Sequence, residues 1–148
     1  KSFKGLPHRF EHIFENEKML IINNSKATNI NSAVKTIKNF NNVFLIVGGQ
    51  IKNTDFSAFK EVKKNISRCF VIGESTDLIY DQISDLSLSF KNFTLENAID
   101  QIFLELEKKE TKVTIILAPA CSSFDQFINF EHRGEKFKEI IMKKLHLL

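Results

Sequence analysis

The stretch Val43-Phe44-Leu45-Ile46-Val47-Gly48-Gly49 is an uninterrupted apolar run that stops at two glycines. Three more short runs rich in Val, Ile, Leu and Phe occur at residues 19–22, 69–72 and 113–117. Each run is too short for a helix of typical length and ends near Gly, Asn, Pro or Ser. Continuous apolar runs of this length are typical of strands that are covered on both faces, as in parallel sheets.

Helical spacing of apolar residues separates these runs. Apolar positions three and four residues apart predict helices around residues 33–40, 95–106 and 137–145, with Thr94 placed to cap the second of them. A weaker pattern predicts another helix at 77–83. Residues 87–90 are expected to add a short strand, and residues 12–22 a hairpin that turns at Asn16-Glu17.

Strand and helix therefore alternate along the chain, which predicts one domain over residues 1–148 with an α/β fold. We expect a three-layer, open, mostly parallel Rossmann-like sheet with helices on both faces. Ligands of such sheets bind beyond the carboxyl ends of the strands. The unusual loops, at residues 23–29, 48–55 and 118–126, follow predicted strands and should converge there.

Composition and charge restrict the class of protein. A hydrophobic fraction of 43%, with no apolar run of about 18 residues, argues against a membrane protein. The net charge of +3 favours small anionic ligands over nucleic acid. Cys69 and Cys121 lie far apart, which favours a reduced, cytoplasmic protein, and the histidines lack zinc-site spacing. Because the chain starts at Lys1 without a signal sequence, we expect a piece of a longer protein.

The first two loops offer donors for an anion. The segment Asn23 to Asn29 carries Lys26 and several hydroxyl and amide groups just before a predicted helix, where backbone N–H groups favour negative charge. Alternatively, it is a helix-capping loop with a solvent-facing lysine. In the next loop, Gly48-Gly49 allows close approach to a ligand, and Lys52 could bind a carboxylate. The alternative is an ordinary turn capped by Thr54 or Asp55.

The third loop, residues 118–127, is rich in small and hydroxyl side chains. Cys121 could be a nucleophile, but no histidine accompanies it in a recognisable triad, so a small buried thiol is the favoured interpretation. Asp125 is expected to cap a short helix. Neither a GxGxxG nor a GxxxxGK[ST] element is present, which argues against a self-sufficient dehydrogenase or kinase.

Five segments in order resemble the C-terminal domain of the Mur ligases. They are Phe3-Lys4-Gly5-Leu6-Pro7-His8-Arg9, Asn24-Ser25-Lys26-Ala27-Thr28-Asn29, Gly48-Gly49 with Lys52 and Asp55-Phe56, Pro119 to Phe127, and Asn129-Phe130-Glu131-His132-Arg133-Gly134. Each is weak alone, but together they span nearly the whole chain. The resemblance is greatest to the members that add D-glutamate to UDP-N-acetylmuramoyl-L-alanine.

This resemblance implies an ATP-dependent amide ligase of cell-wall synthesis. ATP would phosphorylate the carboxylate of the UDP-linked L-alanine, and the amine of D-glutamate would attack the acyl phosphate. An N-terminal UDP-binding domain and a central ATPase domain, which would hold the P-loop and most of the Mg²⁺ ligands, are absent from this sequence. The isolated domain is therefore expected to be inactive, and also to be a monomer without nucleic-acid or membrane partners.

The resemblance also assigns residues. Thr28, Lys52 and Ser123, with the backbone around Asn129 and Phe130, would bind the two carboxylates of D-glutamate. A cation, two hydroxyls and backbone donors suit a doubly anionic ligand.

Three further positions would face the nucleotide. Arg9 and Lys26 match residues that face ATP, where they could offset phosphate charge. Asn24 stands where the family usually has an aspartate that binds the ribose hydroxyls, so nucleotide affinity is expected to be weaker, by about tenfold.

Other functions remain open from sequence alone. The nearest is another amino-acid-adding ligase of the same superfamily, including the folate-polyglutamate enzymes, whose pockets differ around Lys52 and Ser123. A different class is a non-enzymatic binding module that kept the fold. A nucleic-acid-binding domain is disfavoured by the weak charge and the lack of an aromatic–basic platform.

Overall fold

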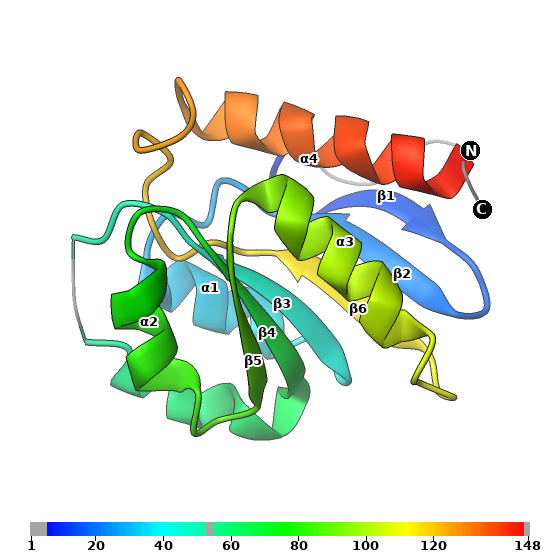
Figure 1. The fold of residues 1–148 in the computed structure, drawn as a ribbon, viewed down its shortest axis with the longest axis horizontal. Coiled ribbons are helices and arrows are strands. Elements are labelled where there is room, and N and C mark those ends of the chain that lie inside the picture. Colours follow the sequence, from blue (N-terminus) through cyan, green and yellow to red (C-terminus); the bar gives the residue numbers. More distant parts are fainter. Residues whose placement is uncertain (1–5, 53–54, 147–148) are drawn as a thin grey trace.

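Six strands form one sheet in the order β1-β2-β6-β3-β4-β5 in the computed structural model, which describes residues 6–52 and 55–146 (Figure 1). The strands are β1 (Glu11–Glu15), β2 (Met19–Asn23), β3 (Val43–Gly48), β4 (Ile66–Ile72), β5 (Leu88–Phe93) and β6 (Val113–Leu117). Strand β1 pairs antiparallel with β2, and all other neighbours are parallel. The predicted open, mostly parallel sheet is confirmed.

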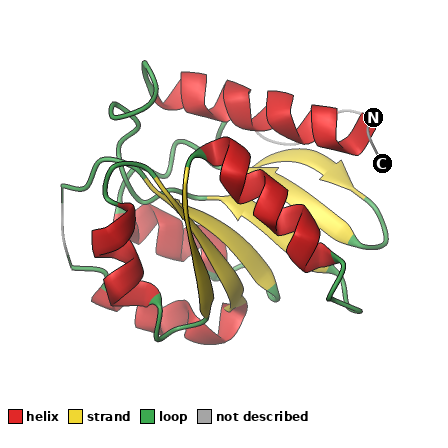
Figure 2. Cartoon of the chain, viewed as in Figure 1, coloured by secondary structure: helices red, strands yellow, loops and turns green. Residues whose placement is uncertain are grey.

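Helices cover both faces of this sheet, as Figure 2 shows. The α-helices are α1 (Ile30–Ile37), α2 (Thr76–Ile83), α3 (Leu95–Leu106) and α4 (Phe130–His146), and η1 (Ser57–Asn65) is a 3-10 helix. One core lies between the sheet and α1, η1 and α2, whereas the other lies between the opposite face and α3 and α4. The three-layer prediction is therefore confirmed.

The central strands explain why the apolar runs are continuous. Every residue of β3 and of β6 is buried, because both faces of each strand pack against a helical layer. Thr94 caps α3 as predicted, since its hydroxyl oxygen accepts a hydrogen bond from the Asn97 amide at 3.1 Å. The predicted hairpin is also present, and the Asn16 side chain accepts hydrogen bonds from the amides of Lys18 and Met19 within its turn.

Several local predictions were incomplete or wrong. Phe40 lies beyond the end of α1, and helix η1 was not predicted. Asp125 does not cap a short helix, because residues 124–126 form a turn and its carboxylate accepts a hydrogen bond from the Glu74 amide at 2.8 Å. Phe56 precedes η1 without a side-chain cap, while Asp55 accepts from the Ser57 amide. Phe3, Lys4, Gly5 and Thr54 lie outside the described residues.

Among the residues that the structure describes, none of the helices combines the length and the hydrophobicity that a membrane-spanning segment needs.

Candidate functional site

The loops after β2, β3 and β6 are joined by main-chain hydrogen bonds at one edge of the sheet. Gln50 and Ser122 form an antiparallel bridge, with N···O distances of 3.0 and 3.3 Å. The Ala120 amide donates to the Ala27 carbonyl at 2.9 Å. These bonds make the three loops one connected surface beside the start of α4 (Figure 1). The predicted convergence of the loops is confirmed.

Two glycines allow the second loop to pass close to its neighbours. Gly48 has φ 130° and Gly49 has φ 143°, conformations that side-chain-bearing residues rarely adopt. A Cβ on Gly48 would lie 2.0 Å from the Ile72 carbonyl oxygen, and one on Gly49 would lie 2.4 Å from the Ser122 carbonyl oxygen. The sequence predicted that Gly48-Gly49 would let the backbone come close to a ligand. In the structure the two glycines instead let it come close to the backbone of neighbouring segments.

A cavity of about 330 Å³ brings together all five residues predicted to bind D-glutamate. We call it the Lys52 pocket, and its walls are Thr28, Lys52, Ser122, Ser123, Phe124, Asn129, Phe130 and Glu131. Thr28 and Lys52 are exposed, whereas Ser123 is only 3% exposed. Thr28, Lys52 and Ser122 also border a second cavity of about 310 Å³. A cation and two hydroxyls from three loops thus meet in one place.

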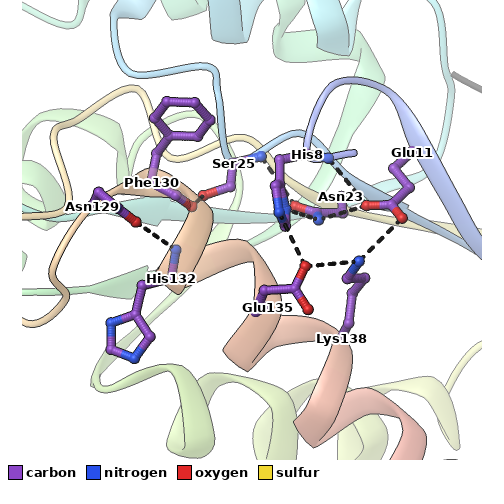
Figure 3. Close-up of polar contacts among 9 residues, drawn as sticks. All are labelled: His8, Glu11, Asn23, Ser25, Asn129, Phe130, His132, Glu135 and Lys138. Atoms are coloured by element: carbon purple, nitrogen blue, oxygen red, sulfur yellow. Dashed lines mark hydrogen bonds and ion pairs between the residues drawn. The ribbon is translucent and has the colours of Figure 1, made fainter. Parts of the chain in front are cut away.

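The N-terminal end of α4 forms the remaining wall of the Lys52 pocket. The Asn129 side chain accepts a hydrogen bond from the His132 amide at 2.8 Å, which caps the helix (Figure 3). Amide groups of the first helical turn have no carbonyl partner within the helix, and the helix dipole favours negative charge there. The wall at Asn129 and Phe130 is therefore suited to an anion through its main chain, while the Asn129 side chain has a structural role.

A buried arginine, which was not predicted as a site residue, holds the pocket walls together. Arg133 is 1% exposed, and its guanidinium donates to the Ser25 hydroxyl at 2.9 Å, the Ser25 carbonyl at 2.7 Å and the Cys121 carbonyl at 3.0 Å. The Ser25 hydroxyl in turn donates to the Phe130 carbonyl at 2.7 Å (Figure 3). Burial lowers the pKa of Arg133 to about 10. The buried guanidinium of Arg133 thus holds three segments of the site together: the loop at Ser25, the loop at Cys121 and the start of α4.

The three residues predicted to face the nucleotide line a different cavity, of about 250 Å³. We call this cavity the Asn24 pocket, and it is lined by Arg9, Phe10, Asn24, Lys26, Ala27, Ser32, Lys35 and Thr36. Asn24 is 4% exposed, so its amide sits in the wall, where it donates to the Thr36 hydroxyl at 2.5 Å and accepts from the Phe10 amide at 3.3 Å. Lys35, which was not predicted as a site residue, is a third cation of this pocket.

The two pockets are adjacent through an aromatic ring. The Lys26 ammonium lies 4.8 Å from the centre of the Phe130 ring, within the range of a cation–π interaction. Lys26 belongs to the Asn24 pocket and Phe130 to the Lys52 pocket. A ligand in one pocket would therefore lie next to a residue of the other.

A polar network fastens the segment before β1 to α4 (Figure 3). The Asn23 amide nitrogen donates to His8 Nδ1 at 2.8 Å and Glu11 Oε1 at 3.1 Å, while its oxygen accepts from the Ser25 amide at 3.1 Å. Since Nδ1 of His8 accepts, its Nε2 carries the proton and faces Glu135 at 3.1 Å. The neighbouring Arg9 is thereby anchored beside the site.

Lys138 completes this network and helps to keep Glu11 ionised. Its ammonium lies 3.2 Å from Glu11 and 3.1 Å from Glu135. Burial acts to raise the pKa of Glu11, but hydrogen bonds from the His8 amide, Lys138 and Asn23 outweigh it and hold that pKa below its ordinary value. The network therefore keeps a buried carboxylate ionised as a structural anchor.

Neither cysteine has the environment of a nucleophile. Cys121 and Cys69 are both buried, and burial raises their pKa values to about 12 and about 11. We expect neither thiol of the folded chain to react with a thiol reagent such as dithiobis(nitrobenzoate) at pH 8, and both to react in denaturant. Rapid release of one equivalent of thionitrobenzoate on mixing the reagent with the folded chain would contradict this expectation.

The same shifts predict how stability depends on pH. Folded thiols keep their protons to higher pH than unfolded thiols, whose ordinary pKa is 9.0, so unfolding releases protons from about pH 9 up to about pH 11 for Cys69 and about pH 12 for Cys121. Stability is therefore expected to fall as pH rises through that window. Denaturant unfolding at several pH values measures this, and a Cys69→Ala variant should show a smaller decline.

Within the described residues, no group of three or more His, Cys, Asp or Glu side chains is arranged to hold a metal ion.

Comparison with known proteins gives one consistent set of relatives. No protein-family model matches the chain. It is 39% identical over 143 residues to the UDP-N-acetylmuramoylalanine–D-glutamate ligase of Wolbachia sp. subsp. Brugia malayi, an alignment that covers 97% of the chain and 29% of that protein. The ligase of the same name from Bdellovibrio bacteriovorus is 35% identical, and the alignment covers 96% of the chain and 30% of that protein. The ligase of the same name from Aquifex aeolicus is 38% identical, and the alignment covers 95% of the chain and 34% of that protein. The chain thus spans about a third of the length of these relatives.

Proposed function

The chain belongs to the D-glutamate-adding branch of the Mur ligases, and from this premise we propose that it is the C-terminal, amino-acid-binding domain of such an enzyme. The parent would join D-glutamate to UDP-N-acetylmuramoyl-L-alanine with ATP. An N-terminal UDP-binding domain and a central ATPase domain would supply the rest of the site. The match to about a third of the length of each relative supports this assignment of the remaining functions to other domains.

The observation that carries this proposal is the Lys52 pocket. Lys52, Thr28 and Ser123 come from three separate loops, yet they border one cavity together with the start of α4. Each carboxylate of D-glutamate needs charge or several donors when it leaves water. In the proposed complex, the Lys52 ammonium and the two hydroxyls bind the carboxylates, and amide groups around Phe130 provide further donors.

The Asn24 pocket is proposed to form one wall of the ATP site. Arg9, Lys26 and Lys35 are exposed cations around it, and none forms an ion pair with another described side chain. Such a donor set fits the phosphates of a nucleotide. Magnesium would neutralise phosphate charge during transfer, and we propose that the central domain holds most of its ligands.

Titration tests this function on the chain itself. We expect the chain to bind D-glutamate in preference to L-glutamate, and NMR amide shifts at Thr28, Ser123 and Phe130 should report it. In a phosphate-release assay with UDP-N-acetylmuramoyl-L-alanine, ATP, magnesium and D-glutamate, the chain alone should show background turnover, because one wall cannot position all reactants. If D-glutamate shifts no amide in the Lys52 pocket, this function is rejected.

Asn24 provides a separate prediction for the nucleotide. Asn24→Asp in a full-length parent should lower the KM for ATP by up to about tenfold, since a charged acceptor binds a hydroxyl more strongly than a neutral one. The Phe10 amide keeps its acceptor, and the Thr36 hydroxyl, which now donates to the Ser32 carbonyl at 2.9 Å, can turn to the new carboxylate.

The KM for D-glutamate should stay unchanged in Asn24→Asp. Asn39→Asp is the matched control, because Asn39 lies in the turn after α1 and is exposed, and it borders none of the described cavities. Equal ATP dependence in both variants and the wild type would show that Asn24 does not meet the nucleotide.

A further inference from the structure

Glu131 is the one acidic side chain among the described residues that border the Lys52 pocket. It also borders an adjoining cavity of about 320 Å³ together with Arg9 and Lys26. Glu131 therefore lies at the boundary between the proposed amino-acid pocket and the cations proposed to face the nucleotide. A carboxylate at this boundary contrasts with the rest of the pocket, whose lysine, hydroxyls and helix N-terminus favour anionic ligands.

The polar neighbours of Glu131 on α4 all have structural partners. His132 accepts from the Ile128 amide at 3.1 Å, Arg133 binds Ser25 and Cys121, and Glu135 pairs with Lys138. By contrast, the Glu131 carboxylate makes no hydrogen bond or ion pair with any residue in the ranges 6–52 and 55–146. The helix dipole stabilises an acidic side chain in the first helical turn, but this effect does not require that the side chain borders the pocket.

Charge complementarity identifies what such a carboxylate would bind. An amino dicarboxylic acid brings two carboxylates and one ammonium into the pocket. Lys52 and the N-terminal end of α4 attract the carboxylates and repel the ammonium. Among the described pocket residues, Glu131 alone offers the ammonium an opposite charge.

We propose that Glu131 binds the α-ammonium group of D-glutamate and thereby sets the preference for the D-enantiomer. This inference rests on the proposed function of the Lys52 pocket. When both carboxylates are held, inversion at the α-carbon moves the ammonium to the other side of the ligand, away from Glu131. Contact with Glu131 would also hold the amine on the side of Arg9 and Lys26, toward the proposed nucleotide site.

Ligand titrations on the isotopically labelled chain test this role. Three probes separate the groups: D-glutamate, L-glutamate, and glutarate, which has both carboxylates but no amine. Glu131→Gln keeps the size of the side chain and removes its charge. We expect it to weaken D-glutamate binding by about fivefold, the upper end of what an exposed ion pair contributes, and to leave glutarate binding within about twofold.

Preference for D- over L-glutamate should disappear in Glu131→Gln, which a merely structural role would not produce. Glu135→Gln is the matched control: it lies on the same helix, one turn later, and borders none of the described cavities. It should keep the D-preference. A Glu131→Gln variant that retains the wild-type preference would overturn the role of Glu131.

Two further outcomes separate this inference from the proposed function. If the wild-type chain binds glutarate and both enantiomers of glutamate equally, the pocket stands as a dicarboxylate site and the role of Glu131 is rejected. If none of the three probes binds, both the proposed function and the role of Glu131 are rejected.

Discussion

Replacing Lys52 with alanine in a full-length parent is expected to cost about 2–4 kcal/mol of transition-state stabilisation, expressed mainly through D-glutamate. One carboxylate of the substrate would lose its cation, and the pocket has no other cation among its described walls. Lys52 itself is exposed and makes no hydrogen bond or ion pair with another described residue, so the fold should not depend on it. Steady-state kinetics with varied D-glutamate measures the loss.

Two controls define what the Lys52 result means. Lys52→Arg should rescue only partly, because a planar guanidinium does not replace a compact ammonium. Lys63→Ala removes an exposed lysine from η1, away from the described cavities, and should leave kinetics unchanged. Native saturation by D-glutamate in Lys52→Ala would remove Lys52 from the pocket, whereas a large fall in melting temperature would assign it a structural role.

Replacing Gly48 with alanine is expected to destabilise the fold by about 3–5 kcal/mol, among the largest losses that a single substitution causes. The new Cβ would lie 2.0 Å from the Ile72 carbonyl oxygen, and φ 130° is itself unfavourable for alanine. Relief requires the ends of β3 and β4 to separate, in the middle of the sheet. Urea unfolding followed by circular dichroism measures the change.

Gly134→Ala provides a graded comparison for Gly48. Its Cβ would meet the His8 side chain, with Nδ1 at 2.1 Å, and not a backbone carbonyl. A side chain can turn away at the cost of the Asn23 and Glu135 contacts, so the loss should be smaller. Equal stability of Gly48→Ala and the wild type would mean that β3 and β4 can separate there without penalty.

Much of the fold could be predicted because its signals are local. Residues 43–47 are apolar without interruption, and residues 113–117 are apolar except for Thr114; the structure buries both segments on both faces. Helix η1 has no such signal: its sequence contains three lysines and a glutamate, and it is wound as a 3-10 helix without a side-chain cap. The first turns of α4 were also missed, since Arg133 occupies a buried position that the apolar pattern assigns to a hydrophobic residue.

The candidate site was predictable to a similar degree. Sequence placed Thr28, Lys52 and Ser123 in loops that should meet, and the structure brings them to one cavity. That these residues bind D-glutamate stays a prediction. The Arg133 fork could not be foreseen, because its partners Ser25 and Cys121 are 108 and 12 residues away and no local pattern connects them.

The bonds between the loops have a consequence for how this site can change over evolutionary time. Gln50, Ser122, Ala27 and Ala120 hold the loops to one another through main-chain atoms, which every amino acid except proline can supply in full. Side chains at Thr28, Lys52 and Ser123 carry none of these bonds. A lineage could therefore exchange them for others and acquire a preference for a different amino acid, while inheriting the same scaffold unchanged.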